Sequence, residues 1–202
     1  MISTFKKISI ITIACLFFLA GCSNGDFHPD MKKTINDFSV TDQNGEAFKR
    51  EDLNGKVTLS DFIFTNCTTV CPPMTFNMAK IQDMLVKDDV TNFQIASFSV
   101  DPAVDSPDIL KEYISKYDAN EDSWRLLTGY DQAWVSQLAL ESFQTIVQDD
   151  PESDQVIHAT RFYLIDQNGT IVKSYRGDDE VEFDLIVSDV KQLIKSGPVD
   201  VD

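Results

Sequence analysis

The fold of this chain is decided by one stretch, Asp61-Phe62-Ile63-Phe64-Thr65-Asn66-Cys67-Thr68-Thr69-Val70-Cys71-Pro72-Pro73-Met74. Residues 57–65 are mostly β-branched, aromatic or aliphatic, which predicts a strand buried on both faces. The strand stops just before Cys67, and Cys71 follows four residues later. Two prolines come next, and they suit the first turn of a helix because that turn does not need their missing N–H groups. We therefore expect a strand, a turn with two cysteines and a helix in immediate succession.

Strand-like and helix-like patterns alternate along the rest of the chain. A strand–helix–strand opening followed by a β-hairpin and a closing helix is the thioredoxin layout. Asn-Gly pairs at 44–45 and 168–169 predict two hairpins. We therefore expect an α/β domain with a thioredoxin-like fold, a central mixed β-sheet flanked by helices, and an N-terminal β-hairpin extension. The expected strands are 57–65, 93–100, 124–128, 161–165 and 171–175, and the expected helices begin at Pro72 and Pro107 and span 131–143 and 183–194.

The first residues have the pattern of an export signal. Two lysines precede an apolar stretch, 8–19, that is shorter than the roughly 20 residues needed to cross a bilayer as a helix. It ends in Leu19-Ala20-Gly21-Cys22, which resembles a bacterial lipobox. We expect a lipoprotein signal peptide at 1–21 and lipid attachment at Cys22, with an ordinary signal peptide or an uncleaved anchor as alternatives. A tether (22–35), a thioredoxin-like domain (36–196) and a frayed C-terminus (197–202) complete the expected organisation. This places the protein on the extracytoplasmic face of a bacterial cell membrane.

The chain is strongly acidic, with 17 Lys and Arg against 33 Asp and Glu and a net charge of −16. Residues 1–21 hold two of the lysines and no acidic residue, so the remainder carries 15 basic and 33 acidic side chains. This balance argues against nucleic acid as a partner, because phosphate backbones are bound by basic patches. It also argues against electrostatic adhesion to anionic lipid. The acidic surface either keeps the protein soluble or steers a cationic partner.

Cys67 and Cys71 are the two cysteines left over once the signal is removed and Cys22 carries the lipid, and their spacing points to chemistry. A disulfide closing so small a loop would constrain the unfolded chain only weakly, so stabilisation explains the pair poorly. Disulfide oxidoreductases typically place two residues between their cysteines, whereas here there are three. On a helix this spacing puts both sulfurs on one face, where they can converge on one ion or, if the first turn distorts, close as a disulfide. Asp61 interrupts the strand at a position that is either solvated or functional, and the sequence does not choose.

His158 is the histidine that such a fold brings to the cysteines. The chain has one other histidine, His28, which lies in the expected tether. Thioredoxins place a cis-proline just before the hairpin strand, but here the residues before Arg161 contain His158 and no proline. Two thiolates and an imidazole suit Cu(I), Cu(II) or zinc. Since structural zinc would want a fourth protein ligand, copper fits Cys67, Cys71 and His158 better.

Several segments together resemble the Sco/SenC family. They are 61–67 with 71–74, then 97–102, 127–129 and the segment around His158, and the resemblance runs from about Phe38 to Ile194. It implies a membrane-tethered thioredoxin-fold protein that helps assemble the binuclear copper centre of cytochrome c oxidase subunit II. It also assigns the copper ligands to Cys67, Cys71 and His158. Asp101, at the end of the neighbouring strand, is then expected to support those ligands or to bind copper transiently.

Two functions follow from this constellation. In the first, a monomeric, non-enzymatic metallochaperone binds copper and hands it to the oxidase subunit. In the second, Cys67 and Cys71 are a redox-active pair in a thiol–disulfide reductase that keeps the oxidase cysteines reduced for metallation. His158 discriminates between them, since copper binding needs it and simple thiol exchange does not. A peroxiredoxin-like peroxidase is a weaker third reading, because its activating arginine and threonine pattern is not matched around Cys67.

Overall fold

The structure of this protein is a computed structural model that describes residues 27–153 and 155–200. The expected signal peptide and the expected lipid attachment site, Cys22, lie outside the described residues. Within those ranges no helix is both long enough and apolar enough to cross a membrane.

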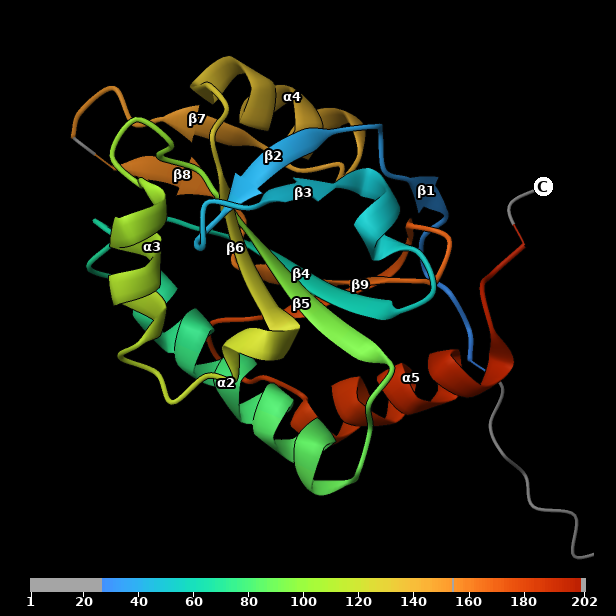
Figure 1. Cartoon of the computed structure of the whole chain (residues 1–202). Helices are drawn as coiled ribbons and strands as arrows, with labels where there is room; N and C mark the ends of the chain where they lie inside the picture. Colours follow the sequence, from blue (N-terminus) through green and yellow to red (C-terminus); the bar gives the residue numbers. More distant parts are fainter. Residues whose placement is uncertain (1–26, 154, 201–202) are drawn as a thin grey trace, which may run out of the picture.

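The centre of the molecule is an eight-stranded mixed sheet with the strand order β1-β10-β9-β4-β5-β6-β2-β3 (Figure 1). Neighbours β4, β5 and β6 run parallel, and the other pairs are antiparallel. This mixed arrangement confirms the expected thioredoxin-like sheet. The strands are β1 (Lys33–Thr34), β2 (Ser39–Asp42), β3 (Ala47–Lys49), β4 (Val57–Ile63), β5 (Phe93–Ser99), β6 (Trp124–Thr128), β9 (Arg161–Ile165) and β10 (Thr170–Arg176).

Helices cover both faces of the sheet (Figure 1). Side chains of α2 (Cys71–Lys87), α3 (Pro107–Ile114) and α5 (Phe183–Ser196) belong to one buried apolar cluster. Side chains of α4 (Gln132–Glu141) belong to a second cluster on the opposite face. Two short 3-10 segments lie in connections: η2 (Arg50–Leu53) between β3 and β4, and η3 (Glu121–Ser123) between α3 and β6. The expected layering of helices around a central sheet is therefore confirmed.

Strand β4 is covered on both faces, which explains why apolar residues occur on both sides of it. Its side chains alternate between the two clusters: Leu59 and Ile63 face α2 and α5, while Phe62 packs on the α4 side. All seven residues of the strand are buried. Asp61 falls on the α2 and α5 face by the same alternation, and its side chain is fully buried. Asp61 is thus not at a solvated position.

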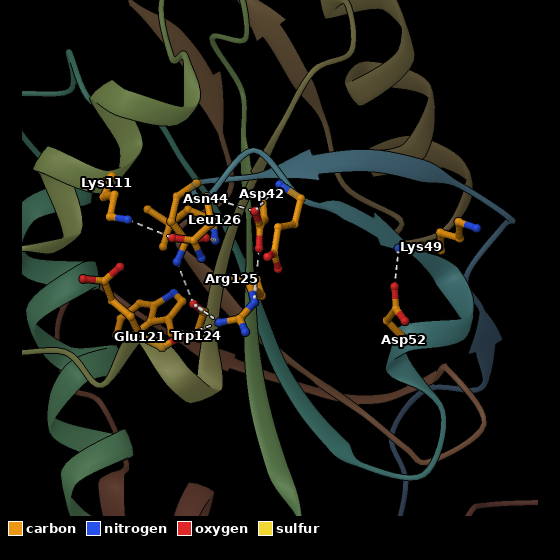
Figure 2. A network of polar contacts seen from close by, with 11 residues as sticks. Asp42, Asn44, Lys49, Asp52, Lys111, Glu121, Trp124, Arg125 and Leu126 are labelled. Carbon is orange, nitrogen blue, oxygen red and sulfur yellow. Dashed lines mark hydrogen bonds and ion pairs between the residues drawn. The ribbon is translucent and has the colours of Figure 1, made fainter.

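The expected N-terminal hairpin is formed by β2 and β3, and β2 pairs with β6, so β3 is the edge strand on this side of the sheet. Polar contacts fix this attachment (Figure 2). The Asp42 carboxylate lies 3.2 Å from the Arg125 guanidinium, and Lys111 of α3 donates to the Asn44 side chain at 3.0 Å. Gln43 is buried and bonds β6 twice, donating to the Trp124 carbonyl and accepting from the Leu126 N–H, each at 2.9 Å. The hairpin is therefore an integral edge of the sheet.

Two segments expected to lie outside the domain are bonded to it in the structure. Within the expected tether, β1 pairs with β10, and the N–H groups of Asp30 and Met31 donate to the Val172 carbonyl. The last residue of the tether, Ile35, is buried, with 2% of its surface exposed. In the expected frayed C-terminus, the Val199 N–H donates to the Asp166 carboxylate at 2.9 Å. The N-terminal segment docks because β10 offers free backbone groups at the sheet edge, whereas the C-terminal segment is held by the buried carboxylate of Asp166.

A second, two-stranded sheet was not expected. Strand β7 (Val147–Asp149) pairs antiparallel with β8 (Val156–His158). The segment around Pro151 connects the two strands of this hairpin. Figure 1 shows the hairpin beside α4 and apart from the main sheet. His158 is therefore the last residue of a short strand rather than part of a loop.

Candidate metal centre

Cys67 and Cys71 lie where β4 ends and α2 begins, as the sequence predicts. Cys71 is the first residue of α2, and its N–H donates to the Cys67 sulfur at 3.3 Å. The next two residues are prolines and have no N–H, and the Met74 N–H bonds the Val70 carbonyl. The N-cap residue is Val70, whose side chain accepts no hydrogen bond from the first turn of the helix. The Cys67 sulfur therefore accepts the N–H of the first residue of this helix, where the helix dipole favours negative charge.

The Cys67 thiol is poised as a thiolate. A hydrogen bond from the Cys71 thiol is the main cause that holds the pKa of Cys67 well below its usual range, and contacts with His158 and the Cys71 N–H act in the same direction. The Cys67 side chain is nearly buried, but it lines a cavity of about 300 Å³ with Val70, Ile157 and His158. A partner can therefore reach the more acidic of the two thiols.

Cys71 has the opposite character. It is fully buried, and its hydrogen bond to Cys67, burial and the negative charges of Cys67 and Asp61 raise its pKa above the ordinary range. Both cysteines are free thiols in the structure. Such a pair titrates as a unit, with the first proton leaving mainly from Cys67.

Asp61 is a buried carboxylate close to this pair. Neither of its oxygens has a hydrogen-bond partner with normal geometry among the described residues. Burial raises the pKa of Asp61 to about 6, while the Ser97 hydroxyl and the charge of His158 partly oppose that rise. Its negative charge also contributes to the raised pKa of Cys71. The sequence left the role of Asp61 open because a lone carboxylate in a strand carries no signal for its surroundings.

The fold brings His158 to the cysteines. Its Nε2 atom lies 3.5 Å from the Cys71 sulfur, and its Nδ1 atom lies 3.1 Å from the Ala159 carbonyl oxygen. A carbonyl can only accept, so Nδ1 carries a proton, and in the neutral form of the ring the lone pair is on Nε2, the atom that faces the thiol. The Phe64 ring meets the imidazole edge-on, with 5.8 Å between centroids. These contacts fix both the tautomer and the orientation that a metal ligand requires.

The spacing of these atoms fits a shared ion. Two ligands of one metal, at bond lengths of about 2.3 Å to sulfur and about 2.0 Å to nitrogen, lie roughly 3.5 Å apart at a tetrahedral angle. The Cys71 sulfur and His158 Nε2 have this separation. The contacts join Cys67 to Cys71 and Cys71 to His158. Within residues 27–153 and 155–200, however, no three or more His, Cys, Asp or Glu side chains lie together in the arrangement of a metal-binding cluster. The donor set of two sulfurs and one imidazole suits copper.

Asp101 lies beside this site rather than in it. It follows the end of β5 and lines a cavity of about 510 Å³ together with Asn66, Asp149 and Gln155. Burial raises the pKa of Asp101, and the nearby carboxylates of Asp105 and Asp149 raise it further. Asn66 directly precedes Cys67, so the same cavity is lined by Asp101 and by the loop that carries Cys67. The predicted role of Asp101 stays a prediction.

This thioredoxin-like domain has two thiols at its strand–helix junction and an imidazole beside them. These are the groups that thiol-exchange proteins and copper-binding proteins use. The SCO1/SenC family model matches residues 28–195. The chain belongs to this family, as the resemblance of its sequence motifs predicts. The SCO1 protein homolog of Bacillus subtilis (strain 168) is 40% identical over 187 residues, which cover 92% of this chain and 96% of the relative.

Solved structures agree with this assignment. A SCO1/SenC family lipoprotein from Bacillus anthracis (strain Ames) has a TM-score of 0.77 and 44% identity over 80% of this chain and 95% of its own. BsSco, a member of the Sco family of cytochrome c oxidase assembly proteins in which a disulfide switch is identified, has a TM-score of 0.75 and 42% identity, covering 83% and 96%. Bradyrhizobium japonicum ScoI, solved with copper bound, has a TM-score of 0.67 and 28% identity, covering 79% and 99%. Copper, predicted from the ligand types, is thus a metal bound within this family.

Proposed function

We propose that this protein is a membrane-tethered copper metallochaperone that helps assemble the binuclear copper centre of cytochrome c oxidase subunit II. The observation that carries the proposal is the 3.5 Å approach of the His158 Nε2 atom to the Cys71 sulfur, next to the acidic thiol of Cys67. Family membership supports it, since BsSco belongs to oxidase assembly proteins and ScoI is solved with copper bound. Copper here is the cargo to be transferred.

Each ligand contributes a different property to copper binding. Cys67 is already acidic and reaches the cavity, so it offers the first thiolate to an incoming ion. Cys71 keeps its proton until the metal arrives, so binding releases a proton and strengthens as pH rises. His158 is held in the tautomer that donates electrons from Nε2. Soft sulfur favours Cu(I), and the imidazole lets the same site accept Cu(II).

A second candidate function, thiol–disulfide reduction, is favoured by the unequal pKa values of the two cysteines. The Cys67 thiolate would attack one sulfur of a partner disulfide, forming a mixed disulfide and releasing the other partner sulfur as a thiolate. Cys71, after losing its proton, would then attack the Cys67 sulfur and release the second partner thiolate. The partner gains two electrons as a dithiol, and Cys67 and Cys71 end as a disulfide. A disulfide cannot bind copper, so the two activities exclude each other at any moment.

The proposed place of action is the extracytoplasmic membrane surface. The lipobox-like residues ending at Cys22 support a lipid anchor, and a B. anthracis relative with 44% identity is described as a lipoprotein. The strongly acidic chain favours a tether made by lipid over adhesion to anionic headgroups. Labelling of cells with a radioactive fatty acid tests the anchor: the wild type should be labelled, and Cys22→Ala should not.

Titration of the reduced protein with Cu(II) tests the copper site. We expect one copper per chain and a sulfur-to-copper charge-transfer band that Cys67→Ala, Cys71→Ala and His158→Ala each remove or shift. The absence of a band and of tight stoichiometry in the wild type would leave thiol reduction as the remaining function.

Complementation separates the two functions in the cell. A strain that lacks this protein should regain oxidase activity with the wild-type gene, but not with His158→Ala, if copper delivery is the essential role. Full recovery with His158→Ala, combined with failure of Cys71→Ala, would instead assign the essential role to thiol reduction.

A further inference from the structure

The loop that carries Cys67 is bonded to a buried carboxylate that belongs to neither β4 nor α2. Asp105 lies in the connection between β5 and α3, and its side chain is fully buried. Its carboxylate accepts the Thr65 hydroxyl at 2.6 Å, and the Thr65 N–H lies 3.3 Å from both oxygens. Thr65 stands two residues before Cys67, just beyond the end of β4.

The same carboxylate also holds the loop that carries Asp101. The Ser99 hydroxyl donates to Asp105 at 2.6 Å, and the Ser99 oxygen accepts the Asp101 N–H at 3.1 Å. The Asp101 carbonyl in turn accepts the N–H of Asp105 at 2.9 Å. One buried anion therefore joins the ends of two adjacent parallel strands, each of which leads into a loop beside the metal centre.

These bonds begin where the strand ladder stops. The last pairing of β4 with its neighbour is the Val100 N–H to the Ile63 carbonyl at 2.8 Å, and residues 64–70 form no helix or strand. At Thr65 the hydrogen-bond partner of the chain is the Asp105 carboxylate, where for the residues of β4 it is the backbone of a neighbouring strand. Hydrogen bonds to a carboxylate are stronger than those between neutral groups, so this contact sets the direction in which the chain runs toward Cys67.

We propose that Asp105 is a positioning residue of the metal and thiol centre, acting on Cys67 through Thr65 and on Asp101 through Ser99. Its hydrogen bonds within the described part of the chain go to Thr65, Ser99 and Asp101 and not to Cys67, Cys71 or His158, so it acts by holding the loop that carries a ligand. For copper binding the proposal rests on the proposed function, and for thiol reactivity it does not.

A general stabilising role is the competing explanation, and the chain offers a matched control for it. Asp166 is also fully buried, and its carboxylate accepts the N–H groups of Asn168, Thr170 and Val199 at 2.8 to 2.9 Å. It holds the turn between β9 and β10, with no contact to the cysteine loop. If Asp105 only stabilises a turn, Asp105→Asn and Asp166→Asn should behave alike.

The experiment measures four variants of the reduced protein: Asp105→Asn, Thr65→Val, Thr65→Ser and Asp166→Asn. Thr65→Val keeps the branched shape and removes the hydroxyl that bonds Asp105, whereas Thr65→Ser keeps the hydroxyl. The readouts are the rate of Cys67 alkylation by iodoacetamide, the disulfide equilibrium with glutathione, and copper affinity, with urea unfolding as the measure of stability.

We expect Asp105→Asn and Thr65→Val to change the alkylation rate and the glutathione equilibrium at least about fivefold and to weaken copper binding about tenfold or more. Thr65→Ser and Asp166→Asn should stay within about twofold of the wild type in all three readouts, although Asp166→Asn loses stability. If Asp105→Asn does not fold, the pair Thr65→Val and Thr65→Ser decides.

Thiol readouts within twofold of the wild type for both Thr65→Val and Asp105→Asn would overturn the proposal. So would an equal change in Thr65→Ser or Asp166→Asn. A wild type that binds no copper would count against the proposed function alone, because the alkylation and glutathione measurements still judge Asp105.

Discussion

The strand–helix junction and the β7–β8 hairpin supply the two halves of one centre, and they are built in opposite ways. At the junction, the bond from the Cys71 N–H to the Cys67 sulfur joins residues four positions apart. The hairpin brings His158 to Cys71 from 87 positions further along the chain. The junction continues a fully buried strand, whereas the hairpin is a separate two-stranded sheet. The comparison teaches that the pairing of the two thiols is a local property, whereas bringing an imidazole to them needs tertiary structure.

The two regions also differ in how firmly they are held. The cysteine loop is tied to the core through Thr65 and the buried Asp105. The hairpin touches that loop through a longer contact, from the Gln155 side chain to the Asn66 carbonyl at 3.5 Å. Ile157, in the middle of β8, is 46% exposed. The imidazole is therefore carried by the less buried of the two regions, where a partner can reach it.

The largest effect should come from breaking the junction. Cys71→Ser removes one of two thiolates, so we expect loss of the copper charge-transfer band and a fall in copper affinity of more than about a hundredfold. The intramolecular disulfide should also be lost, while Cys67 remains alkylatable by iodoacetamide. Isothermal titration with Cu(II) and mass spectrometry after alkylation measure these outcomes. Retention of one tightly bound copper would contradict the ligand assignment.

Removing the hairpin's contribution should separate the two activities. His158→Ala deletes the imidazole and leaves both cysteines and their mutual hydrogen bond, the main cause of the low Cys67 pKa, in place, so copper affinity should fall about a hundredfold. The rate of reaction with a disulfide substrate should stay within about threefold, because thiol exchange depends on the cysteines. His28→Ala, which changes the exposed histidine far from the site, is the control and should change neither property. An equal loss of both activities would show that the two regions are not separable.

Substitution of Asp61 measures how much the buried carboxylate at the junction lowers the stability of the folded protein. Its pKa of about 6 in the folded state lies above the ordinary value of 3.8, so at neutral pH the folded protein carries an unfavourable buried charge. The cost is about 3 kcal/mol well above pH 6 and falls to about 0.5 kcal/mol at pH 4, because the folded state takes up the proton first. Asp61→Asn should therefore gain about 2.5 kcal/mol more, relative to the wild type, at pH 8 than at pH 4.

Urea unfolding of the reduced, metal-free protein at several pH values measures this difference. A stability difference between Asp61→Asn and the wild type that is the same at pH 8 and pH 4 would contradict the prediction.

The smallest effect should come from Asp101, which lies at the edge of both regions. If it supports the ligands, Asp101→Ala should weaken copper binding by about tenfold and shift the charge-transfer band. Asp149→Ala is the control, since Asp149 lines the same cavity on the hairpin side. Unchanged affinity and spectrum in Asp101→Ala would remove this residue from the site.

The sequence by itself determined the sheet, the helices and the thiol pair. Strand β4 alternates between two apolar clusters, so its run of apolar residues is visible without coordinates. The prolines after Cys71 mark the start of α2, and the Asn-Gly pair at 44–45 marks the first hairpin. These features depend on residues close in sequence, where periodicity and turn chemistry are sufficient. His158 was also found, because it is one of two histidines and the fold places its segment opposite the cysteines.

Tertiary structure alone decided the environment of those residues. The burial of Asp61 beside Cys71, the bonds of Asp105 to Thr65 and Ser99, and the docking of β1 on β10 each join segments far apart in the chain. An aspartate has the same local pattern whether it faces water or a protein core, so its pKa and its partners follow only from what packs against it. The thiol pair was therefore predictable from the sequence, while the charges and hydrogen bonds that shift the pKa values of the two thiols could be identified only in the folded structure.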